Sequence, residues 1–169
     1  RLAFLYYKQG FLKRALDTGA DGILIPRVNS GEATARIVKN CKYPPEGRRS
    51  VGIARAHGYG VRFADYVASA NDDVAVIIQV EDIAGVDDIR AIVDEPGVDG
   101  IFLGPYDLSG SMGMPGAVTH PDVLAALDRV KNACSEIGMP MGIFGADAAA
   151  VKPYLDQGYT FNVVGMDHM

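Results

Sequence analysis

Short continuous runs of hydrophobic residues alternate along the chain with stretches whose hydrophobic residues recur every three or four positions. The runs are rich in Val, Ile, Leu and Phe, which is typical of parallel strands buried on both faces. They predict strands at 22–26, 74–81, 98–104, 141–144 and 161–165, and a further strand at 2–7. The periodic stretches predict helices at 10–18, 31–42, 63–70, 86–94, 121–137 and 146–156, with an irregular loop at 43–61.

This alternation predicts an α/β fold with a parallel sheet. Gly19, Gly97 and Gly158 each end a helix shortly before a strand, a repeated turn of the kind that a barrel requires. Only five or six strand-helix units fit into the 169 residues, whereas a complete (β/α)8 barrel takes roughly 250 residues. We therefore expect residues 1–169 to form one domain, a partial TIM barrel whose first strands are missing. An open doubly wound sheet is the alternative, but no G-x-G-x-x-G sequence follows a strand.

Composition narrows the possible function classes. The net charge of −5 argues against a nucleic-acid or anionic-membrane surface, and every apolar run is shorter than about 18 residues, which argues against a membrane span. The two cysteines, Cys41 and Cys134, have no zinc-site spacing and are expected to be free core thiols in a reducing cytoplasm. One cluster of basic residues is expected to be solvated or to face another subunit; its members are Arg48, Arg49, Arg55 and Arg62.

A carboxylate follows each of two neighbouring predicted strands. Glu81 ends the run at 74–81, and Asp107 follows the run at 98–104. A right-handed crossover places these strands side by side, roughly 4.8 Å apart, with both carboxyl ends at one edge of the sheet. Taken singly, either residue could be a cap of its own loop or helix. Two carboxylates this close repel each other unless a cation lies between them, so the pair predicts a divalent metal site.

Four linked motifs carry a resemblance to a known family. They are KRALDTGADGILIP at 13–26, YPPEGRRSVG at 43–52, QVE at 79–81, and GPYDLS at 104–109 followed by MG at 112–113. From about residue 11 to the C-terminus, and in the same order, the chain resembles the HpcH/HpaI family of metal-dependent pyruvate aldolases, which are TIM barrels. The resemblance implies that Glu81 and Asp107 bind the metal, that Gln79 lines the pyruvate site, and that the protein is a homo-oligomer.

Oxygen ligands suit Mg²⁺ or Mn²⁺, and two carboxylates leave coordination positions open for a 2-oxo acid. The metal would then act as a Lewis acid on the enolate. Gly104 and Pro105 lead into a short helical turn that begins near Tyr106, whose free N–H groups are candidates for holding the substrate carboxylate. The lysines fall on predicted helices, their ends or a loop, which disfavours a Schiff-base mechanism.

The resemblance also implies an Arg on the keto oxygen and a His and an Asp for acid–base chemistry. Arg1 is the candidate for the first role, although it lies two residues too far from Asp17. Asp17 matches a residue that reaches the catalytic His of a neighbouring subunit. In that family the His and the Asp lie near the end of the second strand, and this sequence contains nothing before the strand that matches the third. The chain also opens on Arg1 instead of Met, so we expect it to be N-terminally incomplete and unstable alone. His57 is expected to be a solvated loop residue and His120 a helix cap; nothing is argued for His168.

The leading hypothesis is a class II aldolase that cleaves a 4-hydroxy-2-oxo acid, such as a 2-keto-3-deoxy sugar acid, to pyruvate and an aldehyde. One alternative is a non-catalytic remnant or assembly subunit of the same fold. Another is a related metal-dependent enolate enzyme such as a decarboxylase.

Overall fold

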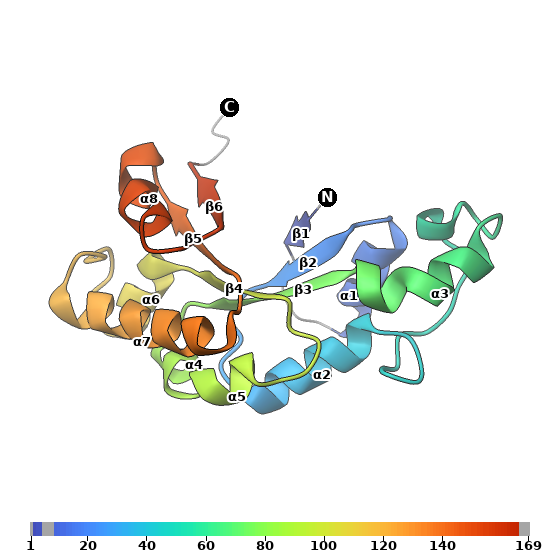
Figure 1. The fold of residues 1–169 in the computed structure, drawn as a ribbon, viewed down its shortest axis with the longest axis horizontal. Coiled ribbons are helices and arrows are strands. Elements are labelled where there is room, and N and C mark those ends of the chain that lie inside the picture. The colour runs from blue at the N-terminus through green and yellow to red at the C-terminus, as the bar shows by residue number, and fades with distance from the viewer. Residues whose placement is uncertain (1, 5–8, 166–169) are drawn as a thin grey trace.

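The computed structural model describes residues 2–4 and 9–165, which form a parallel sheet and a set of helices (Figure 1). The strands are β1 (Leu2–Phe4), β2 (Gly22–Ile25), β3 (Ala75–Val80), β4 (Gly100–Leu103), β5 (Met141–Gly145) and β6 (Phe161–Val164). The α-helices are α1 (Gln9–Asp17), α2 (Gly31–Cys41), α3 (Phe63–Asp73), α4 (Ile83–Asp87), α5 (Ile89–Val93), α6 (Pro105–Ser111), α7 (Pro121–Ile137) and α8 (Ala148–Leu155), and a 3₁₀-helix η1 covers Arg55–His57.

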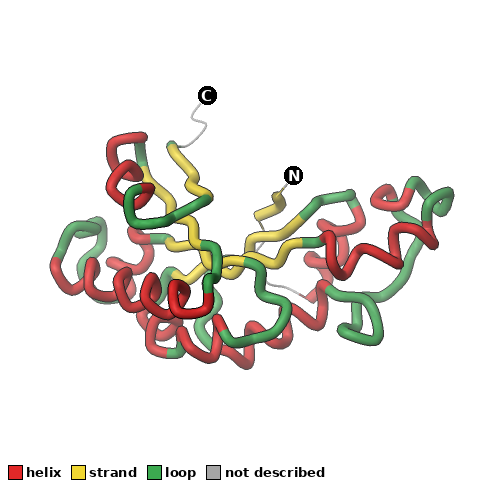
Figure 2. The backbone as a smooth tube through the Cα atoms, in the orientation of Figure 1, coloured by secondary structure: helices red, strands yellow, loops and turns green. Residues whose placement is uncertain are grey.

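Each strand pairs in parallel with the next strand in sequence, in the order β1-β2-β3-β4-β5-β6. The sheet is curled, and helices α2, α4, α5 and α7 lie along its outer side (Figures 1 and 2). A sheet in sequential order with helices on one side is part of a barrel, because a doubly wound sheet reverses its strand order and carries helices on both faces. The structure therefore confirms the predicted parallel sheet and the partial barrel architecture.

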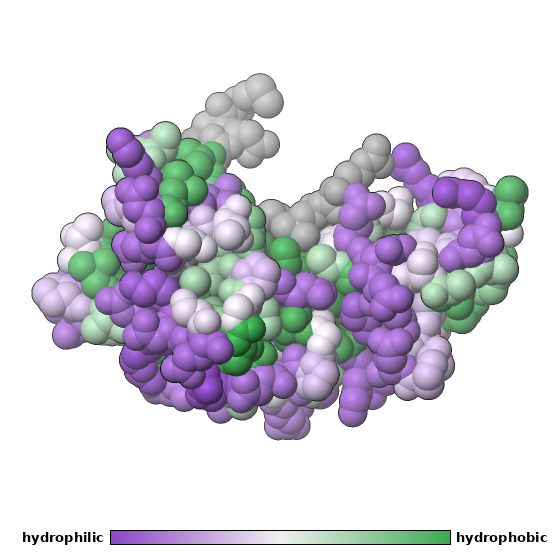
Figure 3. Space-filling view, viewed as in Figure 1, coloured by the Kyte–Doolittle hydropathy of each residue, from purple (hydrophilic) through white to green (hydrophobic). Residues whose placement is uncertain are grey.

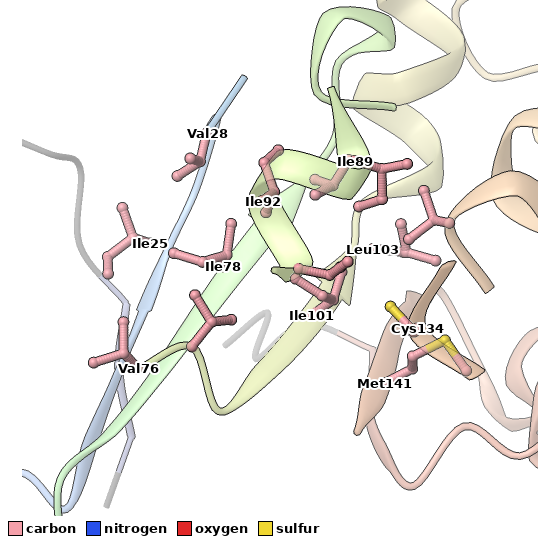
Figure 4. Close-up of a cluster of buried hydrophobic side chains, with 14 of the residues drawn as sticks. Ile25, Val28, Val76, Ile78, Ile89, Ile92, Ile101, Leu103, Cys134 and Met141 are labelled. Atoms are coloured by element: carbon pink, nitrogen blue, oxygen red, sulfur yellow. The ribbon is translucent and has the colours of Figure 1, made fainter. Parts of the chain in front are cut away.

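The side chains of β3 alternate between the face of the sheet that packs against the helices and the face that lines the inside of the partial barrel. Val76, Ile78 and Val80 are fully buried, whereas Gln79 is partly exposed on the opposite face, opposite Phe102 in the register. Figure 4 shows side chains of β2, β3 and β4 packed against those of α5 and α7. Burying a side chain of this size contributes about 1.5–3 kcal/mol, so this outer core anchors the strands whose ends carry the predicted site.

The segment predicted as one helix at 86–94 is two short helices, α4 and α5. Asp82 begins α4, since its side chain accepts a hydrogen bond from the N–H of Ala84 at 2.9 Å. Asp88 separates the helices, and its carboxylate accepts the N–H of Gly31 at 2.8 Å, at the start of α2. A contact to a residue 57 positions away thus interrupts a helix that the local pattern favours.

The remaining elements follow the predicted order, with ends shifted by a few residues; of the strand predicted at 2–7, residues 5–7 lie outside the described residues. The prediction for α7 is confirmed at both ends: the side chain of His120 accepts the N–H of Asp122 at 3.2 Å, and Gly138 ends the helix at φ 70°. Within the described ranges, no helix is both long and apolar enough to cross a membrane.

Two expectations for the loop at 43–61 are wrong. His57 is 1% exposed, not solvated: its Nδ1 accepts the N–H of Gly60 at 3.0 Å, and its Nε2 lies 2.7 Å from the carbonyl oxygen of Gly52. Arg49 is 2% exposed and lies 4.5 Å above the ring of Tyr43. The loop is therefore organised around a buried imidazole and a buried guanidinium.

Cys41 and Cys134 are free and buried, as predicted. Burial raises the pKa of each thiol to about 12, so both remain protonated at neutral pH.

Candidate functional site

The predicted carboxylate pair lies at the carboxyl ends of two adjacent strands. Glu81 directly follows β3, and Asp107 lies in the first turn of α6, which begins just after β4. Val80 and Leu103 are partners in the register of these strands, which brings the two ends together. Glu81 is 6% exposed, so its carboxylate is held within the protein.

The surroundings of Glu81 fix the position of its carboxylate. The side-chain amide of Gln79 donates a hydrogen bond to Oε2, and the backbone N–H and positive charge of Arg27 act to lower the pKa of the carboxylate. Burial and then the negative charge of Asp107 raise the pKa of Glu81. The hydrogen-bond donors and positive charge around Glu81 are therefore too weak to offset its burial and the repulsion from Asp107 when Glu81 is ionised.

Gly104 makes room for this carboxylate. A Cβ added at position 104 would lie 2.7 Å from Oε2 of Glu81 and 3.0 Å from Nε2 of Gln79. Any side chain larger than hydrogen would therefore displace a residue of the predicted site.

The donor set fits a divalent cation with hard oxygen ligands. Glu81 and Asp107 repel each other, and a cation between them would remove the repulsion that raises the pKa of Glu81. Among residues 2–4 and 9–165 there is no group of three or more His, Cys, Asp or Glu arranged to hold a metal. Two carboxylates without further protein ligands suit Mg²⁺ and similar ions, which keep several positions for water and substrate.

A cleft of about 640 Å³ opens beside the carboxylates. It is lined by Gln79, Gly104, Tyr106, Asp107, Phe144, Ala146 and Gly165. Four of the predicted substrate-site residues, Gln79, Gly104, Tyr106 and Asp107, thus line one cavity. Pro105 is buried in the first turn of α6 and is not among its lining residues. The rings of Tyr106 and Phe144 meet edge to face with centroids 6.1 Å apart and form an apolar wall.

A smaller polar pocket of about 270 Å³ also reaches Asp107. Its lining residues are Arg27, Glu81, Asp82, Asp107, Gly110 and Ser111. Sequence reasoning missed Arg27, although its position held a signal: it follows β2, the strand beside β3, at the same edge of the sheet.

Asp17 does not join this group in the described structure. Asp17 ends α1 just before β2 begins, at the opposite ends of the strands from Glu81. The six residues of β3 separate these two edges by about 20 Å. The carboxylate of Asp17 pairs with Arg49 at 3.0 Å and with Lys13. Arg1 and His168 lie outside the described residues.

The chain resembles proteins of known family. A family model described as HpcH/HpaI aldolase/citrate lyase matches residues 6–169. A 5-keto-4-deoxy-D-glucarate aldolase from Escherichia coli is 41% identical over 157 residues, which cover 92% of this chain and 61% of that enzyme. The chain thus spans about three fifths of the length of this curated relative.

Solved structures agree with this similarity. An HpcH/HpaI aldolase/citrate lyase family protein from Burkholderia cenocepacia superposes with a TM-score of 0.90 at 38% identity, over 96% of this chain and 66% of that one. An HpcH/HpaI aldolase from Desulfitobacterium hafniense also reaches 0.90, at 33% identity, over 98% of this chain and 65% of that one.

Proposed function

The chain belongs to the HpcH/HpaI aldolase/citrate lyase family, and from this we propose that it is part of a divalent-metal-dependent aldolase that cleaves a 4-hydroxy-2-oxo acid to pyruvate and an aldehyde. One observation carries the proposal: Glu81 and Asp107 come from adjacent strand ends and line one polar pocket, and Asp107 also lines the cleft beside Gln79. Carboxylates paired beside a cleft, with no third acidic or imidazole ligand among the described residues, leave room for a chelating 2-oxo acid.

We propose that Glu81 and Asp107 hold Mg²⁺ or Mn²⁺. When bound, such an ion supplies Lewis-acid stabilisation for the negative charge that develops on the pyruvyl fragment. Gln79 orients Glu81 through its hydrogen bond to Oε2. Tyr106 and Phe144 shield one side of the cleft from water, which strengthens the electrostatic interactions inside it.

In the proposed reaction, the bond between C3 and C4 of the substrate breaks and its electron pair stays on C3, which gives the pyruvate enolate. The C4 hydroxyl loses its proton to a base, and C4 becomes the aldehyde carbon. From the family resemblance alone, we propose that Arg1 contacts the keto oxygen and that Asp17 reaches the catalytic histidine of a neighbouring subunit. Gly104 and Pro105 place the first turn of α6 against the cleft, where the substrate carboxylate would lie.

We also propose that residues 1–169 belong to a single domain and that the protein is a homo-oligomer. Support for the second point comes from the segment at 50–62, which exposes several large hydrophobic side chains: Val51, Ile53, Tyr59 and Val61. Figure 3 shows hydrophobic residues at the end of the molecule that carries α3. An exposed apolar patch on an ordered loop is typical of a subunit contact.

The test is pyruvate release from 5-keto-4-deoxy-D-glucarate by the full-length protein, followed with lactate dehydrogenase. We expect EDTA to stop the release and Mn²⁺ to restore it. Glu81→Gln should lower the rate at least a hundredfold, whereas Glu136→Gln, which changes an exposed glutamate on α7, should not. Pyruvate release that survives EDTA would contradict the metal-dependent mechanism.

A further inference from the structure

Ser111 links the two segments that carry the predicted metal ligands. It is the last residue of α6, the helix in which Asp107 lies one turn earlier, and residues four apart share one face of a helix. The hydroxyl oxygen of Ser111 accepts the backbone N–H of Ile83 at 3.0 Å, two residues after Glu81. A side chain of α6 thus supplies the hydrogen-bond acceptor for the first N–H of α4, 28 positions away in the sequence.

The N–H of Ile83 needs an acceptor from outside α4, because the first N–H groups of a helix have no partner within it. The cap of α4, Asp82, accepts the N–H of Ala84. The hydroxyl of Ser111 is itself held in place, since it donates to the carbonyl oxygen of Leu108 at 2.7 Å. Its hydrogen is therefore used within α6, and its oxygen is left to accept the N–H of Ile83.

A second hydrogen bond joins the same two segments on the other side of the ligands. The N–H of Gly104 donates to the carbonyl oxygen of Val80 at 3.3 Å. Glu81 and Asp107 therefore each lie between two points at which their segments are joined. The bond of Gly104 is between backbone groups, whereas the other bond needs the hydroxyl of Ser111. Ser111 also lines the polar pocket together with both carboxylates.

We propose that Ser111 is a positioning residue of the metal site: its hydroxyl holds the helix of Asp107 against the segment of Glu81. This inference rests on the proposed function, in which the two carboxylates hold Mg²⁺ or Mn²⁺. Metal-ligand distances tolerate only about 0.2 Å of displacement, so a small separation of the two segments weakens binding. The competing explanation is that Ser111 only stabilises the ends of two helices, which would affect the stability of the protein and leave its affinity for the metal unchanged.

The experiment compares two variants of the full-length protein that differ by one hydroxyl. Ser111→Thr keeps a hydroxyl that can bond the carbonyl oxygen three residues earlier, and Ser111→Val has the same branched shape without it. Electron paramagnetic resonance measures free Mn²⁺ and so gives the affinity. We expect Ser111→Val to lower the affinity about three- to tenfold, as for the loss of one hydrogen bond, and Ser111→Thr to keep it near the native value. Because Ser111 is exposed, water can satisfy the N–H of Ile83 in its absence, so both variants should fold.

Ser135→Ala is the control, since Ser135 is an exposed serine of α7 that lines neither the cleft nor the polar pocket, and its Mn²⁺ affinity should equal that of the native protein. The spectrum of bound Mn²⁺ is a second measurement: because it depends on ligand geometry, it should change in Ser111→Val and not in Ser111→Thr. Native affinity and spectrum in Ser111→Val, whatever its Tm, would overturn the inference. An equal loss of affinity in both variants would also overturn it, because the hydroxyl would then not be the cause.

The same titrations separate this inference from the proposed function. If the native protein binds no Mn²⁺, the proposed function fails and the role of Ser111 fails with it. If the native protein binds Mn²⁺ and Ser111→Val binds it equally well, only the role of Ser111 fails.

Discussion

Replacing Gly104 with alanine tests the geometry of the carboxylate site with a single methyl group. The backbone of Gly104 has φ −109°, which an L-residue adopts without strain, so the effect comes from the added atom. That atom would lie 2.7 Å from Oε2 of Glu81 and 2.9 Å from its Cβ, where ordinary contact begins at 3.4 Å. Glu81 must therefore move by several tenths of an ångström, up to about 0.7 Å at Oε2.

Metal-ligand distances tolerate only about 0.2 Å of displacement, so this movement removes Glu81 from its place as a ligand. One of two protein carboxylates is then lost. We expect Gly104→Ala to lower the affinity for Mn²⁺ at least tenfold, which corresponds to about 1.4 kcal/mol. Overpacking of a site usually costs about 1–3 kcal/mol of stability, so a modest fall in Tm should accompany the effect.

Isothermal titration calorimetry with Mn²⁺ measures this change, and circular dichroism verifies that the variant is folded. Gly10→Ala is the control: a Cβ at position 10 would meet no heavy atom within 4 Å, and Gly10, in α1, lines neither the cleft nor the polar pocket. Its Mn²⁺ affinity should equal that of the native protein. A folded Gly104→Ala protein with unchanged Mn²⁺ affinity would show that the position of Glu81 is not critical for metal binding.

Three further predictions address the same site. Glu81→Gln and Asp107→Asn should each lower Mn²⁺ affinity at least tenfold in calorimetry, about 1.4 kcal/mol, and normal binding in either variant would remove that residue from the ligand set. Burial and the charge of Asp107 raise the pKa of Glu81 above its ordinary value of 4.5, so the metal-free native state loses stability as the pH rises from 4.5 through the raised pKa. With EDTA present, Glu81→Gln should therefore raise Tm at pH 7.5 and have little effect on Tm near pH 4.5. A difference in Tm that does not depend on pH would contradict this prediction. Proton exchange at the methyl group of pyruvate, followed by NMR in deuterated water, should stop with EDTA, and borohydride should trap no covalent adduct; a trapped adduct would indicate a Schiff-base lysine instead.

Local patterns in the sequence were sufficient for the main elements and for the pairing of two carboxylates at one edge of the sheet. The helix α7 was predicted at both ends because Pro121, Gly138 and one hydrophobic stripe act within a few residues of each other. Glu81 and Asp107 were found because parallel strands place their carboxyl ends at one edge, a rule that needs no knowledge of side-chain contacts. The family motifs identified the family, and the chemistry proposed for those carboxylates follows from it.

Other features depend on residues that are distant in sequence. The break between α4 and α5 comes from the bond of Asp88 to Gly31, and the burial of Arg49 comes from its pairing with Asp17. His57 was predicted to be solvated because a histidine in a Gly-rich segment carries no local sign of burial, yet the loop folds around its ring.

Arg27 illustrates the same limit at the site itself. In the sequence it is one basic residue after a strand, 54 positions from Glu81, and no periodicity connects the two. Its place after β2, at the same sheet edge as Glu81, could be read from the sequence, but the left-handed turn at Arg27 and the pocket that it shares with Glu81 appear only in the tertiary structure. Hydrophobic period and turn chemistry are local properties and can be read along the chain. The register between strands and the clearance at Gly104 arise only when separate segments pack, so the tertiary structure decides them.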